Sequence, residues 1–141
     1  KVYSKKLNSL VERYSLIKKI KFISHCKEMP LAYSLADVVV SASIEPEAFG
    51  RVAVESQSMG KPIVASNIGG SRETILNNKS GFLYKHDDPR ELAKNLNTVI
   101  QLSQEQLKLM GIEGRKNITK KFDVEAMCDS NLREYKKLLK N

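Results

Sequence analysis

The strongest constraint on the fold is a run in which two apolar segments flank a helix-forming one. Residues 37–43 (DVVVSAS) and 61–66 (KPIVAS) are short and largely apolar, which is typical of parallel strands covered on both faces. Residues 50–59 lie between them and predict a helix that opens after a Phe-Gly turn. Strands that alternate with helices imply parallel pairing with right-handed crossovers. We therefore predict an α/β fold with a Rossmann-like parallel sheet flanked by helices.

The same patterns place the remaining elements. We expect helices at 4–14, from Pro30, at 71–75, 89–100 and 103–120 and from Asp123, and strands at 20–24 and 82–84. In the helix from Pro30, Leu31, Leu35 and Ala36 are expected to face inward. Ser71 is expected to cap the short helix that follows it. The last two helices are extra C-terminal helices outside the sheet.

Length and composition limit the classes of protein to consider. The chain has 141 residues, enough for one domain, and 41% of them are hydrophobic, which is typical of a globular protein. It has no apolar run long enough to span a bilayer, and its polar, basic start does not resemble a signal peptide. We expect a cytoplasmic protein. Because the sequence begins at Lys1 rather than Met, we also expect residues 1–141 to be one domain of a longer protein.

The formal net charge of +8 is concentrated near the N-terminus. Residues 1–29 carry eight Lys or Arg against two Glu. A solvated basic surface is the simpler interpretation, and peripheral contact with an anionic membrane or attraction of an anionic substrate is the alternative. No nucleic-acid-reading motif is present, so we expect no nucleic-acid partner. Cys26 and Cys128 lie far apart without metal-ligand spacing, which favours free thiols.

The predicted helix after Phe49 carries the most informative polar residues. A helix N-terminus offers free N–H groups and partial positive charge, and Gly50 lacks the Cβ that would hold a phosphate away from the backbone. Glu55 lies about one and a half turns into the helix and is suited to accept hydrogen bonds from vicinal ribose hydroxyls. Glu47 precedes the helix and is placed to approach a sugar. Each residue alone favours an ordinary turn or a surface carboxylate, but together they favour a nucleoside diphosphate site.

A second glycine loop follows the neighbouring strand. Gly69 and Gly70 are expected at the same sheet edge, where they either approach a ligand closely or simply form a turn. Arg51 and Arg72 are candidate diphosphate partners because a guanidinium binds phosphate through two parallel hydrogen bonds. Either arginine is also consistent with a solvated surface charge.

The order of these motifs resembles a known family. Glu47 and Glu55 form the E-x7-E pattern of retaining GT-B glycosyltransferases, especially glycosyltransferase family 4 (group 1). The chain is similar to the C-terminal, donor-binding domain of that family along the following segments: 36–41, 47–55, 60–66, 69–70, Glu73 and 81–83. The resemblance implies a partial GT-B fold. It also implies a two-domain enzyme that moves a sugar, with retention, from a nucleoside-diphosphate sugar to a glycan or lipid-linked acceptor.

The resemblance implies roles for individual residues. Glu47 matches the first motif carboxylate, which contacts the donor sugar near the reacting carbon, and is the expected catalytic residue. Ala48, Phe49 and Gly50 match a segment whose backbone amides meet sugar hydroxyls or phosphate.

Further along the motif, Glu55 matches the carboxylate that binds ribose, and Val52 matches an apolar contact to the nucleoside. Arg51 departs from the family, in which many members have an apolar residue at this position.

The resemblance also implies parts that lie outside this sequence. The N-terminal acceptor domain, the first strand of the donor domain and the family's Arg/Lys pair for the diphosphate are expected upstream. No Asp-x-Asp motif is present, so no metal or other cofactor is expected.

Two other functions stay open at this stage. The chain fits a non-catalytic nucleotide-sugar-binding or interaction module that has the same fold. A sugar-phosphate or nucleotide hydrolase would need a nucleophile or a metal cluster that the sequence does not display.

Overall fold

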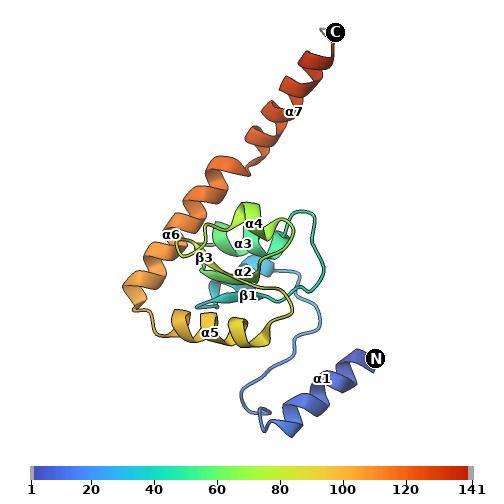
Figure 1. The fold of residues 1–141 in the computed structure, drawn as a ribbon, viewed down its shortest axis with the longest axis vertical. Coiled ribbons are helices and arrows are strands. Elements are labelled where there is room, and N and C mark those ends of the chain that lie inside the picture. Colours follow the sequence, from blue (N-terminus) through green and yellow to red (C-terminus); the bar gives the residue numbers. More distant parts are fainter. Residues whose placement is uncertain (1, 140–141) are drawn as a thin grey trace.

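The fold is built on a three-stranded parallel sheet. The computed structural model describes residues 2–139; Lys1 of the basic segment and residues 140–141, at the ends of the predicted domain 1–141, lie outside them. Strands β1 (Val39–Ser41), β2 (Ile63–Ser66) and β3 (Gly81–Tyr84) pair in the order β1-β2-β3 (Figure 1). The parallel pairing and the α/β class predicted from the sequence are confirmed.

Helices cover both faces of this sheet. Helix α3 (Arg51–Ser58) lies on one face together with α2 (Met29–Ser34) and α4 (Ser71–Thr74), and α5 (Pro89–Ile100) covers the other face (Figure 1). Helix α6 (Gln104–Lys121) packs beside α3. The crossover connections bring the loops after β1 and β2 to the same edge of the sheet.

The central strand shows why both faces must be covered. All four residues of β2 are buried. Ile63 and Ala65 pack with Ala53 of α3, whereas Val64 points to the other side and packs with Val99 of α5. Alternate side chains of a strand point to opposite faces, so this strand contributes to two hydrophobic clusters. The continuous apolar run seen in the sequence is explained by this double burial.

The starts of three helices are fixed by side-chain caps. The Asp88 carboxylate accepts hydrogen bonds from the first backbone N–H groups of α5. Ser103 and Gln106 form a reciprocal capping box at the start of α6. Asp123 caps α7 (Val124–Leu138) through the Ala126 N–H. These satisfied N–H groups explain why the predicted helix starts are correct to within one residue.

Two local predictions are wrong. Residues 20–24 form no strand, and Phe22 and Ile23 are exposed. A strand needs a neighbour for its backbone hydrogen bonds, and no described segment pairs with these residues. The cap of α4 is Gly70 rather than Ser71, which lies inside the helix.

The inward face of α2 also differs from the prediction. Leu31 is exposed, Leu35 is 80% exposed, and Ala36 is half-buried. The buried residue is Tyr33, whose side chain faces α3. Because α2 has only six residues, it presents a single side chain to its neighbour, and an aromatic ring buries more area there than either leucine.

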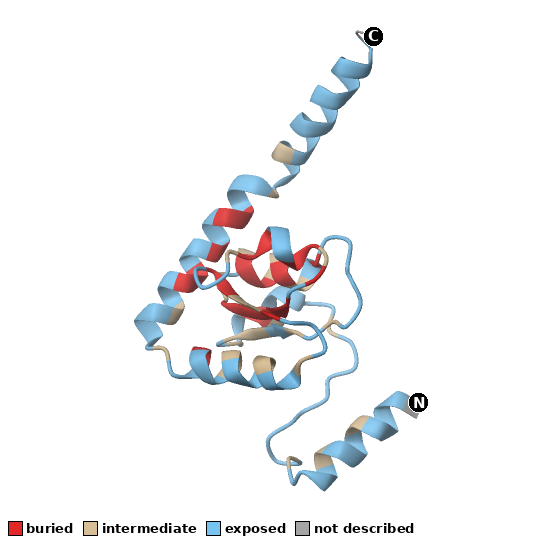
Figure 2. Ribbon diagram, in the orientation of Figure 1, coloured by how far each residue is buried: buried red, intermediate tan, exposed pale blue. Residues whose placement is uncertain are grey.

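The terminal helices contribute little to the core. Helix α1 (Val2–Arg13) is joined to α2 by an extended, mostly exposed segment, and α7 contains no buried residue and projects away from the sheet (Figure 2). The predicted extra C-terminal helices are therefore present, but only α6 packs on the domain. Among residues 2–139, no helix combines the length and apolarity needed to cross a membrane.

Candidate functional site

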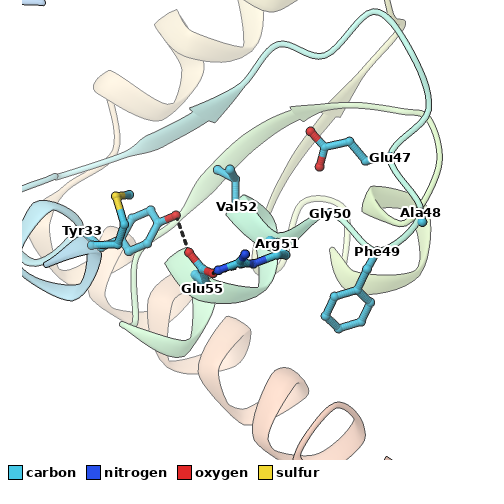
Figure 3. Close-up of a pocket in the computed structure, with 9 residues that line it drawn as sticks. Tyr33, Glu47, Ala48, Phe49, Gly50, Arg51, Val52 and Glu55 are labelled. Carbon is cyan, nitrogen blue, oxygen red and sulfur yellow. Dashed lines mark hydrogen bonds and ion pairs between the residues drawn. The ribbon is translucent and has the colours of Figure 1, made fainter. Parts of the chain in front are cut away.

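A cavity of about 530 Å³ opens at the carboxyl end of the sheet. It is lined by Met29 and Tyr33 of α2, by residues 47–52, and by Glu55 of α3 (Figure 3). It thus brings together every predicted site residue except Gly69, Gly70 and Arg72. Ligands of open α/β sheets bind at this edge.

The N-terminus of α3 faces this cavity. Gly50 occupies the N-cap position with φ of 75°, a left-handed conformation that glycine adopts without strain. No side chain caps the helix. Because the first N–H groups of a helix have no partner within it, α3 presents donors and partial positive charge to the cavity. This arrangement suits a phosphate.

Glu55 is held by two donors from different elements. The Tyr33 hydroxyl donates to Oε2 at 3.0 Å. Arg51, four residues earlier on α3, donates to Oε1 from Nε at 3.0 Å and from Nη2 at 2.7 Å. Figure 3 shows Tyr33 and Arg51 meeting the carboxylate from different directions. Both carboxylate oxygens are therefore engaged.

The electrostatics of this cluster keep both donors protonated. Burial, together with the hydrogen bond to Glu55, raises the pKa of Tyr33 to about 12. The hydrogen bond to Glu55 also raises the pKa of Arg51 above its ordinary value. At neutral pH the carboxylate therefore accepts from a neutral phenol and a charged guanidinium.

Glu47 lies on the other side of Val52 from Glu55 (Figure 3). Its Oε1 accepts a hydrogen bond from the Ser43 hydroxyl at 2.9 Å, and its backbone carbonyl accepts from the Gly70 N–H at 3.0 Å. The loop after β1 is thus anchored to the loop after β2. The two motif carboxylates flank the N-terminus of α3, as expected for groups that contact different parts of one ligand.

Gly69 and Gly70 lie behind the Glu47 loop and do not line the cavity. A Cβ on Gly69 would overlap the Glu47 carbonyl oxygen, and a Cβ on Gly70 would overlap the Phe49 carbonyl oxygen. The glycines therefore let the two loops touch, which fixes the backbone that carries Glu47. Their predicted contact with substrate stays a prediction.

Two further side chains point elsewhere. The Phe49 ring turns away from Glu47 (Figure 3) and packs edge-on against Phe122, with ring centroids 5.8 Å apart. A contact between Phe49 and a polar ligand would therefore use its backbone. Arg72 donates to the Asn67 carbonyl at 2.9 Å and does not line the cavity.

Sequence reasoning missed Tyr33. It also missed a second cavity of about 410 Å³, which shares Met29, Tyr33, Arg51 and Glu55 with the first. This second cavity is lined further by Lys27, Pro30, Ser58 and Met59. The only signal in the sequence was an aromatic residue in the helix before the first buried strand, and such residues usually belong to the core. Within residues 2–139, no three His, Cys, Asp or Glu side chains gather closely enough to hold a metal ion.

A family model described as "Glycosyl transferases group 1" matches residues 1–117. Among curated proteins, spore coat protein SA of Bacillus subtilis is 30% identical over 112 residues. That match covers 79% of this chain and 29% of the Bacillus protein.

Two solved structures have the same fold along nearly the whole chain. A glycosyltransferase from Rickettsia africae superposes with a TM-score of 0.91 at 34% identity, covering 99% of this chain. HepE of Anabaena, solved in complex with UDP-glucose, superposes with a TM-score of 0.87 at 29% identity, covering 96% of this chain. This chain spans 37% of each of those two proteins.

Proposed function

This chain belongs to the glycosyl transferases group 1 family, and from that premise we propose that it is the nucleotide-sugar-binding domain of a retaining glycosyltransferase. The observation that carries the proposal is the placement of Glu47 and Glu55 in one cavity, on either side of the uncapped N-terminus of α3. The complex of the similar HepE with UDP-glucose supports this class of ligand.

In the proposed complex, each part of the donor meets one part of the site. Glu55 accepts hydrogen bonds from the ribose hydroxyls, and Val52 makes an apolar contact with the nucleoside. The diphosphate lies at the N–H groups of Gly50 and the first turn of α3. The transferred sugar lies near Glu47 and the backbone of Ala48 and Phe49.

The chemistry follows from this placement. The bond between the anomeric carbon and the diphosphate oxygen breaks, and the nucleoside diphosphate leaves with the electron pair. The N-terminus of α3 stabilises the negative charge that develops on the leaving group. The acceptor hydroxyl attacks from the same face and passes its proton to the departing diphosphate oxygen, while Glu47 orients the sugar or stabilises its positive charge. Glu47 is not assigned as a covalent nucleophile, because Glu55 is engaged with ribose rather than with the glycosidic bond.

The proposal extends to the protein of which this domain is part. Residues 1–141 would work with an N-terminal acceptor domain that binds a glycan or lipid-linked acceptor, and the first donor-domain strand would come from upstream residues.

We propose a cytoplasmic location with peripheral membrane contact through the basic segment 1–29. Flotation with anionic vesicles at low salt should detect this contact, and a protein that does not float with the vesicles would contradict it. No metal cofactor is proposed, so EDTA should leave transfer unchanged.

A thermal-shift panel tests donor binding. A ligand that binds only the folded state raises the melting temperature. We expect one of UDP, GDP, ADP or dTDP, or a sugar conjugate of it, to stabilise the protein. Glu55→Ala should abolish the shift, whereas the control Glu125→Ala, on exposed α7, should keep it. A panel without any shift in the wild-type protein would refute the proposal.

Turnover separates an enzyme from a binding module with the same fold. With its acceptor, the full-length protein should release nucleoside diphosphate from the donor. Glu47→Ala should lower turnover by at least about tenfold while the nucleotide still binds. Binding without any release would instead favour the non-catalytic module.

A further inference from the structure

We propose that Arg51 closes the nucleotide site of the free protein by occupying Glu55, and that a nucleoside diphosphate opens the site by drawing Arg51 onto its phosphates while Tyr33 holds Glu55 in place. This inference rests on the proposed function. To the phosphate contact that the sequence suggests for Arg51 it adds a change of partner from Glu55, and it assigns Tyr33 as a positioning residue.

The Glu55 carboxylate can accept only a limited number of hydrogen bonds. A carboxylate has about four lone-pair sites, two on each oxygen. Two Arg51 donors occupy Oε1, and the Tyr33 hydroxyl takes one site on Oε2. A vicinal diol has two hydroxyl donors, so it finds only one free site. Ribose can therefore bind fully only after Arg51 releases Oε1.

Burial decides which of the two donors moves. The Arg51 side chain is 83% exposed, so water competes for its ion pair and its departure uncovers no core. Tyr33 is only 6% exposed and is the one buried residue of α2. Rotating its ring would leave a void between α2 and α3. Arg51 is therefore the movable partner, and Tyr33 the fixed one.

The diphosphate that we propose as the new partner of Arg51 would bind next to its guanidinium. Arg51 is the first residue of α3 and directly follows Gly50, so its guanidinium is tethered beside the helix N-terminus where a diphosphate would bind. Among residues 2–139, Arg51 is also the only basic residue that lines the first cavity, which holds the carboxylates of Glu47 and Glu55. A diphosphate entering between two carboxylates needs a counter-charge, and guanidinium pairs with phosphate in bidentate fashion.

This exchange predicts opposite effects of one substitution on two ligands. A nucleoside without phosphates must compete with Arg51 for Glu55 and offers it no new partner. Arg51→Ala should therefore strengthen nucleoside binding several-fold. The same change should weaken nucleoside diphosphate binding by about tenfold or more, because a charge-assisted pair to phosphate is lost.

Titration calorimetry and ligand-observed NMR test the exchange. The probes are the nucleoside diphosphate selected by the thermal-shift panel and its nucleoside, at up to millimolar concentration. The exposed Arg115→Ala is the matched control and should leave both affinities unchanged. Equal weakening of both ligands by Arg51→Ala, no change in either, or no nucleoside binding to this variant would overturn the exchange. If the wild-type protein binds no nucleotide at all, the proposed function fails as well.

Tyr33→Phe tests positioning with minimal loss of packing, because it removes only the hydroxyl. The wild-type protein should prefer the nucleoside diphosphate over its 2′,3′-dideoxy analogue, and the variant should lose most of that preference. Tyr84→Phe, which alters a buried tyrosine outside the cavity, is the matched control. A variant that weakens both ligands by the same factor would show a general structural role and contradict positioning of Glu55.

Discussion

At the scale of single residues, Glu55 joins two helices and binds one neutral and one charged donor. It accepts hydrogen bonds from Tyr33 of α2 and Arg51 of α3. A carboxylate that is oriented before its ligand arrives loses less conformational freedom on binding. The free protein thus has the proposed ribose acceptor in place, with its Oε1 covered by Arg51.

The ionisation of Tyr33 reports directly on this cluster. Its pKa rises from 10.0 to about 12, so the folded state holds the phenolic proton more tightly than the unfolded state does. The resulting stability is complete below about pH 10 and is lost as the pH rises through 12. In a titration followed by phenolate absorbance, Tyr33→Phe should remove amplitude only from the late part of the curve. Loss of amplitude near pH 10 would contradict both the burial of Tyr33 and its hydrogen bond to Glu55.

The sequence predicted the carboxylates of the site better than their partners. Glu47 and Glu55 were identifiable only as a pair on either side of a glycine turn, since each acid alone fits an ordinary surface carboxylate. Tyr33 was not, because a tyrosine in a short helix is usually a core residue. The role of Gly70 was also hidden, since its contact is with the Phe49 backbone, and spacing along the chain does not reveal which loops touch.

At the scale of secondary-structure elements, the stability of the site depends on β2 and on the helices at its two faces. Val99 of α5 is fully buried against Val64, whereas the next residue, Ile100, is 73% exposed. Two adjacent residues of one helix therefore offer a matched comparison of buried and exposed side chains.

Val99→Ala should lower the free energy of unfolding by about 2 kcal/mol, from lost burial and the cavity that remains. Ile100→Ala should change it by less than about 0.5 kcal/mol. Urea denaturation measures both values. Similar losses for the two variants would show that α5 does not face the sheet with Val99.

The predicted elements were correct where a helix carries its own capping residue, and wrong where the structure depends on a segment distant in the sequence. The capped helices α5, α6 and α7 carry their own start signals at Asp88, Ser103 and Asp123. The segment 20–24 has the composition of a strand, but a strand exists only when another segment accepts its hydrogen bonds. The prediction of the buried face of α2 was wrong for a related reason. A six-residue helix is too short for the spacing of apolar residues to define one side.

At the scale of the whole molecule, the sheet and helices α2 to α6 form the packed domain, and α7 extends beyond it (Figure 2). The α/β class was predictable because alternating strands and helices permit few topologies. The chain spans only 29% to 37% of the length of the three relatives in these comparisons.

Because α7 buries no residue, its removal should leave the domain folded. Deletion of residues 124–141 should lower the free energy of unfolding by less than about 1 kcal/mol and leave nucleotide binding unchanged. Denaturation and calorimetry of the shortened chain measure these quantities. Loss of cooperative unfolding would mean that α7 packs on the domain in solution.

The most direct test of the central claim is a crystal structure of the protein with a nucleoside-diphosphate sugar bound. We expect the ribose hydroxyls on Glu55, the diphosphate at the N-terminus of α3 with Arg51 turned toward it, and the sugar beside Glu47. A nucleotide bound elsewhere, with Arg51 still paired to Glu55 and the cavity open to solvent, would contradict this account.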